Sequence, residues 1–155
     1  QLASLVDEIP QIQYIKEERQ PGPKHIAEVT SVVSDQIKCV FGGAGGKFMI
    51  DEMNRGAKGN MPACEFGDIL VKINNLWKKD NTEAARSLHR KLLPLINLEN
   101  HPFMRYILKR RGVFSNLIER APAGKLSLDE NDRHEISELL KVISPEIESY
   151  PILPD

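Results

Sequence analysis

Lys16 is the strongest candidate for a catalytic residue in the sequence. It ends an apolar, alternating run over residues 10–16, and Glu17 and Glu18 follow at once. The alternation predicts a β-strand with three side chains on one face: Ile12, Tyr14 and Lys16. A primary amine at the end of an apolar strand can lose its charge through burial and attack a ketone to form a Schiff base. The plainer alternative is a solvated lysine that pairs with Glu17 or Glu18.

A glycine-rich stretch over residues 42–46 is the second candidate for a site. It lacks the lysine and hydroxyl pattern of a phosphate-binding loop. We therefore expect a strand-to-helix turn that lets a ligand approach the backbone and that can act as a mobile lid.

Cysteine and histidine usage argues against a metal site. Cys39 and Cys64 lie far apart, with no histidine at ligand spacing, and this predicts buried thiols in a reducing compartment, the cytoplasm. The four histidines are scattered, so we interpret them as ordinary surface residues.

The composition of the chain bears on which classes of molecule it could bind. The chain has 155 residues, 41% hydrophobic and 28% charged, with a net charge of −1, which is typical of a globular domain. This balance gives no electrostatic case for nucleic acid or an anionic membrane. No apolar run approaches the length of a membrane span, and the start does not read as a signal segment.

The elements that would position Lys16 alternate through the first half of the chain. Hydrophobic periodicity predicts strands over residues 10–16, 37–43 and 57–63, with helices over 23–35 and 47–56 between them. Gly56 is expected to stop the second of these helices.

Only helices are expected after residue 65. They cover residues 65–80, 82–100, 102–112 and 128–143. The sequence predicts Thr82 and Asp129 as N-caps, a kink at Pro94 and a C-terminal stop at Gly112.

The order strand, helix, strand, helix, strand predicts a parallel sheet covered by helices. Three strands cannot close a barrel, so the pattern indicates the closing part of a (β/α)8 TIM barrel followed by a helical bundle. Residues 1–64 would be the closing βα units, and residues 65–155 the last barrel helix and a C-terminal extension, in one structural domain without its N-terminal half. Functional residues of such barrels lie at the C-terminal strand ends. Four residues occupy these ends here: Lys16, Gly42, Gly43 and Met61.

Three segments carry a resemblance to a known family: YIKEE, VFGGAGGKFMIDEMNRGAKGNM and LLPLINLENHPFMRYILKRRGV. Together they resemble the C-terminal half of the dihydrodipicolinate synthase/N-acetylneuraminate lyase family of class I aldolases and dehydratases. The resemblance implies barrel strands six to eight, with Lys16 as the Schiff-base lysine. It implies that Gly43, or Gly42 if the register slips by one, lies beside the bound keto acid and that Met61 lines the pocket.

The resemblance also implies the chemistry and the partners. We expect a lyase, aldolase or dehydratase, that acts on a 2-keto-3-deoxy sugar acid or on pyruvate plus an aldehyde, with no cofactor and no metal, in a dimer or tetramer. The family's proton-relaying tyrosine and carboxylate-binding hydroxyls would lie upstream of Gln1, so the isolated chain is expected to be inactive.

Two departures from the family pattern leave the exact substrate open. Residues 44–46 stand where many members carry acidic residues, and Pro62 stands where many carry serine. The run LPLINLEN looks closest to members that act on 2-keto-3-deoxy sugar acids. The rival interpretation is a non-catalytic α/β module that binds a partner through its open sheet edge.

Overall fold

The computed structural model of the chain describes residues 1–33, 37–98, 101–121 and 127–154. The chain divides into two units, Gln1–Ala63 and Cys64–Asp155, and each is described by itself. The ends of the helices expected over 23–35 and 82–100 fall partly outside the described residues.

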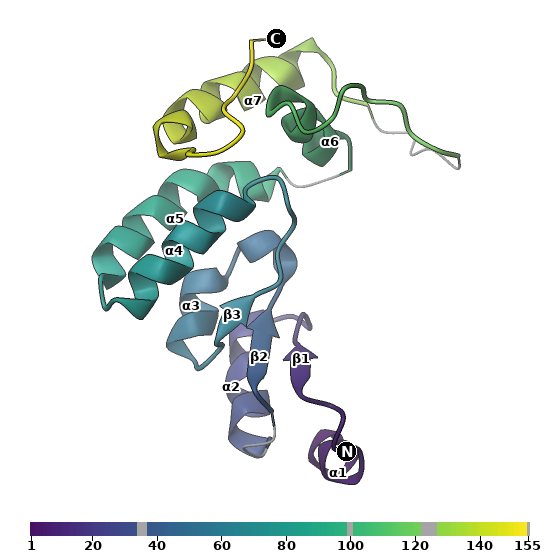
Figure 1. The fold of residues 1–155 in the computed structure, drawn as a ribbon, viewed down its shortest axis with the longest axis vertical. Helices are drawn as coiled ribbons and strands as arrows, with labels where there is room; N and C mark the ends of the chain where they lie inside the picture. Colours follow the sequence, from purple (N-terminus) through teal and green to yellow (C-terminus); the bar gives the residue numbers. More distant parts are fainter. Residues whose placement is uncertain (34–36, 99–100, 122–126, 155) are drawn as a thin grey trace. The chain divides into compact units, whose positions relative to one another are not determined.

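Three short parallel strands form the sheet of the first unit (Figure 1). They lie in the order β1-β2-β3, with bounds Tyr14–Lys16, Cys39–Gly42 and Gly59–Asn60. The register pairs Lys16 with Phe41, and Phe41 in turn with Gly59. Because neighbours in register point to the same side of a sheet, these three positions share one face.

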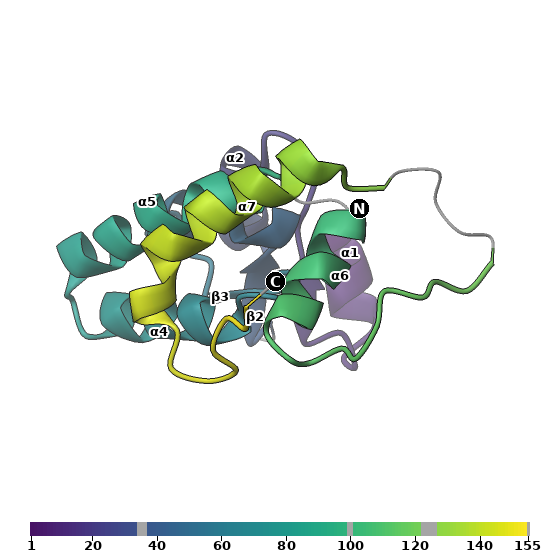
Figure 2. The ribbon, with the colours of Figure 1, turned by 90° about the horizontal axis from the view of Figure 1, so that it is seen from above.

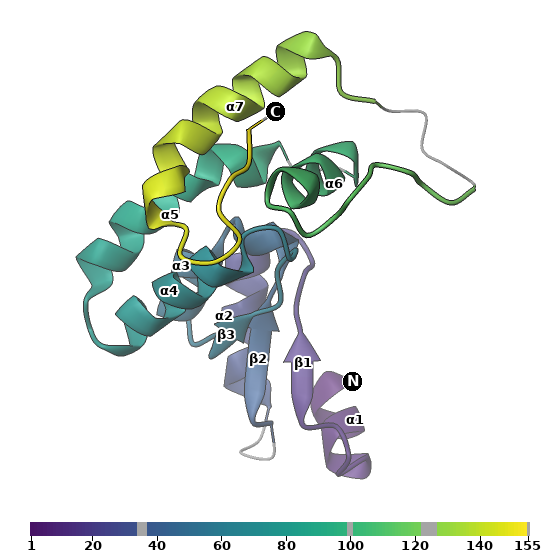
Figure 3. The same cartoon turned by 45° about the horizontal axis from the view of Figure 1, so that its top comes forward.

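Helices cover the opposite face of the sheet (Figure 3). They are α1 (Leu2–Glu8), α2 (Gly22–Val32) and α3 (Met49–Asn54), with a 3-10 turn, η1 (Ala44–Gly46), before α3. The core joins Val6 of α1 and Ile26 and Val29 of α2 to Val40 of the sheet, with Ile15 packed against it. Helix α1 was not predicted from the sequence.

The face of the sheet that carries Lys16 has exposed apolar side chains. Tyr14 and Phe41 stack on it, with ring centroids 6.0 Å apart. Tyr14 is 57% exposed, and Met61, one residue beyond β3, is 48% exposed. Ile12 was expected on this face but packs against the helix-covered core. That part of the strand prediction is wrong, because β1 begins only at Tyr14 and strict alternation does not extend to Ile12.

The second unit is helical. Its elements are α4 (Gly67–Lys78), α5 (Thr82–Asn97), α6 (His101–Arg110), α7 (Glu130–Ile143) and a final 3-10 turn, η2 (Ser144–Glu146). Helices α4 and α5 form an antiparallel hairpin, and α7 packs on α5 (Figures 1 and 2). From β1 onward, the order of strands and helices predicted for the described residues is therefore confirmed, and α1 is an additional helix before it.

Helix ends follow the expected signals with one exception. Asp129 caps α7 in a capping box, in which Asp129 and Asp132 each accept the other's backbone N–H. Gly112 follows α6 with φ of 69°, the left-handed conformation that ends helices. Thr82 is the first residue of α5, and Asn81 takes the N-cap position that was predicted for Thr82.

Among the described residues, no helix combines the length and apolar character needed to cross a membrane. Neither cysteine is in a disulfide; Cys39 is buried as expected, whereas Cys64 is exposed and contradicts the prediction of two buried thiols.

Candidate functional site

Lys16 lies at the C-terminal end of β1, on the sheet face opposite the helices. Its side chain is 36% exposed, and Nζ lies 3.1 Å from Oε2 of Glu18. The ion pair that the sequence allowed with Glu17 or Glu18 is thus made with Glu18. The amine and a carboxylate form the centre of the candidate site.

Glu18 ties Lys16 to the glycine-rich turn. The backbone N–H of Ala44 donates to Oε1 of Glu18 at 2.8 Å. This hydrogen bond, and next the one from Lys16, hold the pKa of the Glu18 carboxyl below its ordinary value. Gly43 leaves the room for Glu18, since a Cβ built on Gly43 would lie 2.2 Å from Cγ and Oε1 of Glu18.

The turn itself needs residues without bulky side chains. Ala44, Gly45 and Gly46 have φ angles of 48°, 65° and 92°. Glycine adopts such angles readily, whereas alanine does so at a cost. The turn directs the Ala44 amide toward Glu18, so the glycine-rich stretch serves at least to present backbone donors beside Lys16.

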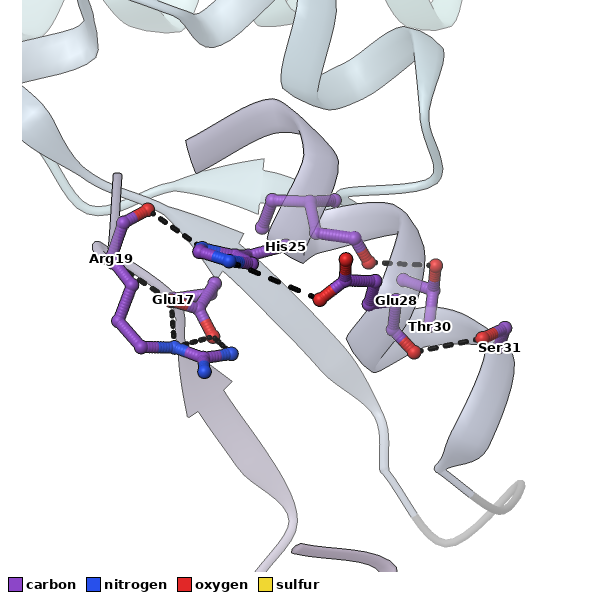
Figure 4. Close-up of polar contacts among 7 residues, drawn as sticks. Glu17, Arg19, His25, Glu28, Thr30 and Ser31 are labelled. Carbon is purple, nitrogen blue, oxygen red and sulfur yellow. Dashed lines mark hydrogen bonds and ion pairs between the residues drawn. The ribbon is translucent and has the colours of Figure 1, made fainter. Parts of the chain in front are cut away.

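Glu17 takes part in a separate set of polar contacts, with Arg19 (Figure 4). It is buried, and both its oxygens accept hydrogen bonds from Arg19, from the backbone N–H at 2.8 Å and from Nη2 at 2.9 Å. The Arg19 guanidinium keeps the pKa of Glu17 below its ordinary value, against the effect of burial. Arg19 O in turn contacts Nδ1 of His25 at 3.1 Å, so this network anchors the segment after β1 to α2.

A second carboxylate, that of Glu52 in α3, lies on the helix-covered side of the glycine-rich turn, and Glu52 is only 1% exposed. Its Oε2 accepts from Nδ2 of Asn60 at 2.9 Å, and its carboxylate also accepts the backbone N–H of Gly43. Burial raises the pKa of Glu52 to about 7, while these two hydrogen bonds oppose the rise. A Cβ on Gly42 would lie 1.7 Å from Oε2 of Glu52, so the absence of a side chain there makes room for the carboxylate.

The structure brings some of the predicted site residues together. Lys16 and Gly43 meet at Glu18. Gly42 borders Glu52 on the helix-covered side instead. Met61 follows the last residue of β3 and donates its backbone N–H to Gly42 O at 2.9 Å, so continued alternation puts its side chain on the face of Lys16.

Two residues of the site, Glu52 and Asn60, were not predicted from the sequence. Glu52 had a signal, because it lies on the apolar side of its helix beside three buried residues: Met49, Ile50 and Met53. A carboxylate at such a position is buried only with hydrogen-bonding partners. Asn60 had no signal, since its role depends on the register of β3.

No group of three or more metal-ligating side chains occurs in the part of the chain that the structure describes. The described residues of the site supply an amine from Lys16, carboxylates from Glu18 and Glu52, and backbone amides from the turn.

No family model matches the chain. A curated relative, L-2-keto-3-deoxyarabonate dehydratase of Azospirillum brasilense, is 26% identical over 132 residues, which cover 83% of this chain and 43% of the relative. Dihydrodipicolinate synthase from Rhodopseudomonas palustris matches with a TM-score of 0.80 and 30% identity, over 91% of this chain and 49% of that one. Dihydrodipicolinate synthase from Aquifex aeolicus matches in fold, with a TM-score of 0.74, 18% identity and coverage of 90% and 48%.

The chain thus spans less than half the length of each of these relatives. Its three parallel strands and helices correspond to about half of a dihydrodipicolinate synthase barrel chain, which confirms the predicted fold class and the family resemblance.

Proposed function

We propose, from this similarity to half of a dihydrodipicolinate synthase chain, that residues 1–155 carry the Schiff-base lysine of a class I lyase. The observation that carries the proposal is the position of Lys16, an amine at the C-terminal end of a parallel strand, on the face that helices leave open. In (β/α)8 enzymes that end of the barrel is where catalytic side chains gather.

The chemistry follows from the amine. Neutral Lys16 Nζ would attack C2 of a 2-keto acid, and loss of the former carbonyl oxygen as water would give an iminium. The iminium would then draw electrons from the neighbouring carbon, which allows C–C cleavage, condensation or elimination of a hydroxyl group. The lysine itself supplies the electrophile, so the proposed reaction calls for no metal and no organic cofactor.

Glu18 is placed to assist that step. Lys16 must lose a proton before it can attack, and the Glu18 carboxylate lies within 3.1 Å of the amine. Gly43 and the Ala44 amide would border the keto acid, and Met61 would line the same face. Gly42 contributes through its contact with Glu52.

The substrate class is a 2-keto acid. The name of the Azospirillum relative favours a 2-keto-3-deoxy sugar acid and a dehydratase reaction, and the dihydrodipicolinate synthase match favours pyruvate and an aldehyde. Since the chain covers about half of these relatives, we propose that further barrel strands supply the proton relay and the groups that bind the substrate carboxylate. We also propose a dimer or tetramer, as the family resemblance implies.

Trapping the imine tests the function. The assembled protein, incubated with pyruvate and borohydride, should become covalently modified on Lys16, as peptide mass spectrometry would locate. Lys16→Ala should abolish trapping and turnover with the fold intact, and Lys16→Arg should be equally inactive because a guanidinium stays protonated.

Lys38→Ala is the matched control, because Lys38 is exposed and precedes β2 at the other end of the strands. It should trap normally. A Lys16→Ala protein that retains turnover would refute the Schiff-base role, and an unmodified wild-type protein would favour a binding module that uses its open sheet.

A further inference from the structure

Two glutamates hold successive backbone amides of the glycine-rich turn from opposite sides. Glu52, on the helix-covered side, accepts from Nδ2 of Asn60 at 2.9 Å, and the same Nδ2 donates to Gly43 O at 3.4 Å. The N–H of Gly43 also interacts with the Glu52 carboxylate and lowers its pKa. Glu18, on the side of Lys16, accepts the N–H of Ala44 at 2.8 Å. Since Glu18 also pairs with Lys16 at 3.1 Å, a continuous series of polar contacts runs from α3 to the lysine.

The space around Glu52 is closely fitted to a carboxylate. A Cβ on Gly42 would lie 2.3 Å from Glu52 Cδ, and one on Gly22 would lie 3.3 Å from Oε1. Burying a carboxyl group costs more than burying an apolar side chain of the same size. A glutamate that only filled this space would therefore make the fold less stable than an apolar residue would. A glutamate that orients Gly43 has a role that an apolar residue could not take.

We propose that Glu52 is a positioning residue for Lys16, whose carboxylate fixes the Gly43 amide and thereby the Ala44 amide that holds Glu18 beside the lysine. This inference rests on the proposed function of Lys16. Glu52 acts through the turn and makes no contact of its own with the substrate.

The arrangement can respond to pH. Burial brings the pKa of Glu52 to about 7, and the neighbouring carboxylates of Asp51 and Glu18 also raise it. On α2, which packs on α3, His25 and Glu28 contact each other and Lys24 is exposed; Lys58, before β3, is exposed as well. Glu52 is thus ionised above neutral pH, where it accepts most strongly from Gly43, and protonated below it.

Asn60 offers a partner for each state. Its Nδ2 donates to the ionised Glu52 at 2.9 Å. Its Oδ1 is buried and accepts no hydrogen bond from the described residues. Rotation of the amide by half a turn would let Oδ1 accept from protonated Glu52, which would then bind Gly43 less strongly.

Amide NMR shifts test this inference without reference to activity. In the wild-type chain, assembled as it occurs, the Gly43 and Ala44 N–H signals should titrate together near pH 7. In Glu52→Gln they should not titrate in that range. His25→Gln is the control for the histidine of α2, the helix that packs on α3, and the Gly43 and Ala44 titration should persist in it.

Imine formation with pyruvate provides the second readout. Above pH 7, Glu52→Gln should form the imine roughly tenfold or more slowly than wild type, and below pH 6 the two rates should converge. A merely structural glutamate would slow the reaction equally at all pH values.

The outcomes separate the two proposals. Gly43 and Ala44 amides that do not titrate in the wild type, or that lose their titration in His25→Gln, would overturn the role of Glu52, even if Glu52→Gln fails to fold. A wild-type protein that shows the titration but forms no imine would instead overturn the proposed function.

Discussion

At the scale of single residues, the site depends on where side chains are missing. Gly43 has no side chain where Glu18 lies, and Gly42 has none where Glu52 lies. Two carboxylates therefore approach the same turn of backbone closely, one of them within reach of Lys16. A side chain added at either glycine would displace a carboxylate before it disturbed the core.

Gly43→Ala should therefore slow imine formation with little loss of stability. The added Cβ would meet Glu18 at 2.2 Å and push it away from the Ala44 amide and from Lys16. The rate of trapping by borohydride and the thermal midpoint should be measured on the same preparation. Gly67→Ala is the control, because a Cβ there meets nothing within 4 Å. Unchanged trapping kinetics in Gly43→Ala would contradict the geometry assigned to Glu18.

We expect the free energy of unfolding to fall at acid pH, in part because Glu17 becomes protonated there. Its pKa is held down by Arg19, so its stabilising contribution is complete above its ordinary pKa of 4.5 and is lost as the pH falls through its lower value in the folded protein. Arg19→Met should lower the free energy of unfolding at pH 7 and should have much less effect near pH 2, where the Glu17 carboxyl is protonated in both proteins.

Denaturant titrations at several pH values would measure this effect. Arg55→Met is the control, because Arg55 pairs with Asp51 on the surface and such pairs contribute little. If Arg19→Met and Arg55→Met lower the free energy of unfolding equally at pH 7, the contact between Glu17 and Arg19 stabilises the fold no more than a surface ion pair does.

At the scale of elements, the predictable part of the fold is the part with strong periodicity or capping. The amphipathic pattern of α5 and the Asp129 cap of α7 are local signals, and both helices occur where they were expected. Strand β3 has only the two residues Gly59 and Asn60, and its sequence is weak in β propensity. It could be expected only from the alternation of the elements before it.

What could not be read from the sequence depends on contacts between elements. The partner of Lys16 was left open between Glu17 and Glu18, because the choice is set by the Ala44 amide and by Arg19. The burial of Glu52 arises where α3 meets the ends of β2 and β3, which no local pattern encodes. Helix α1 was missed because its seven residues bury only Val6 and carry no capping side chain.

Arg111 should be the most important polar side chain for the second unit. It is 5% exposed and directly follows α6, with Nη2 at 2.7 Å from Oδ2 of Asp68 in α4 and at 2.6 Å from the carbonyl of Ser149. Arg111→Met should lower the free energy of unfolding by about 3–5 kcal/mol, since it leaves Asp68 and the backbone carbonyl of the buried Glu65 without their donor.

Arg90→Met is the matched control, because Arg90 pairs with Glu83 on the exposed side of α5 and should contribute little. Chemical denaturation followed by circular dichroism at neutral pH would measure both. A loss below about 1 kcal/mol in Arg111→Met would mean that the helices of this unit pack independently of the arginine.

At the scale of the whole molecule, the sheet has one face packed and one face open. Helices cover the face of Ile15 and Val40, whereas Tyr14 and Met61 on the other face are about half exposed. Both β1 and β3 are edge strands, and barrels remove such edges by closure. The interpretation of residues 1–64 and 65–155 as parts of one barrel domain stays a prediction.

The 155-residue chain by itself should therefore self-associate at micromolar concentration. Covering one large apolar side chain contributes about 1.5–3 kcal/mol, so a second copy on this face is favoured. Sedimentation velocity should show dimers or larger species, and Tyr14→Lys with Met61→Lys should shift the distribution toward monomer. Val142→Lys, at a similarly exposed residue of α7, should leave it unchanged. A soluble monomer that binds no hydrophobic dye would contradict the interpretation of this face.

The fit between Gly42 and Glu52 has a consequence for exchanging segments among homologous proteins. The Oε2 atom of Glu52 occupies the place of a Cβ at position 42, so the two positions cannot vary one at a time. A donor helix that brings a glutamate to position 52 will be accepted only by a recipient strand that ends in glycine. A recipient with any other residue at position 42 needs a shorter side chain at position 52. The boundary of a successful chimera therefore lies before β2 or after α3, and not in the turn between them.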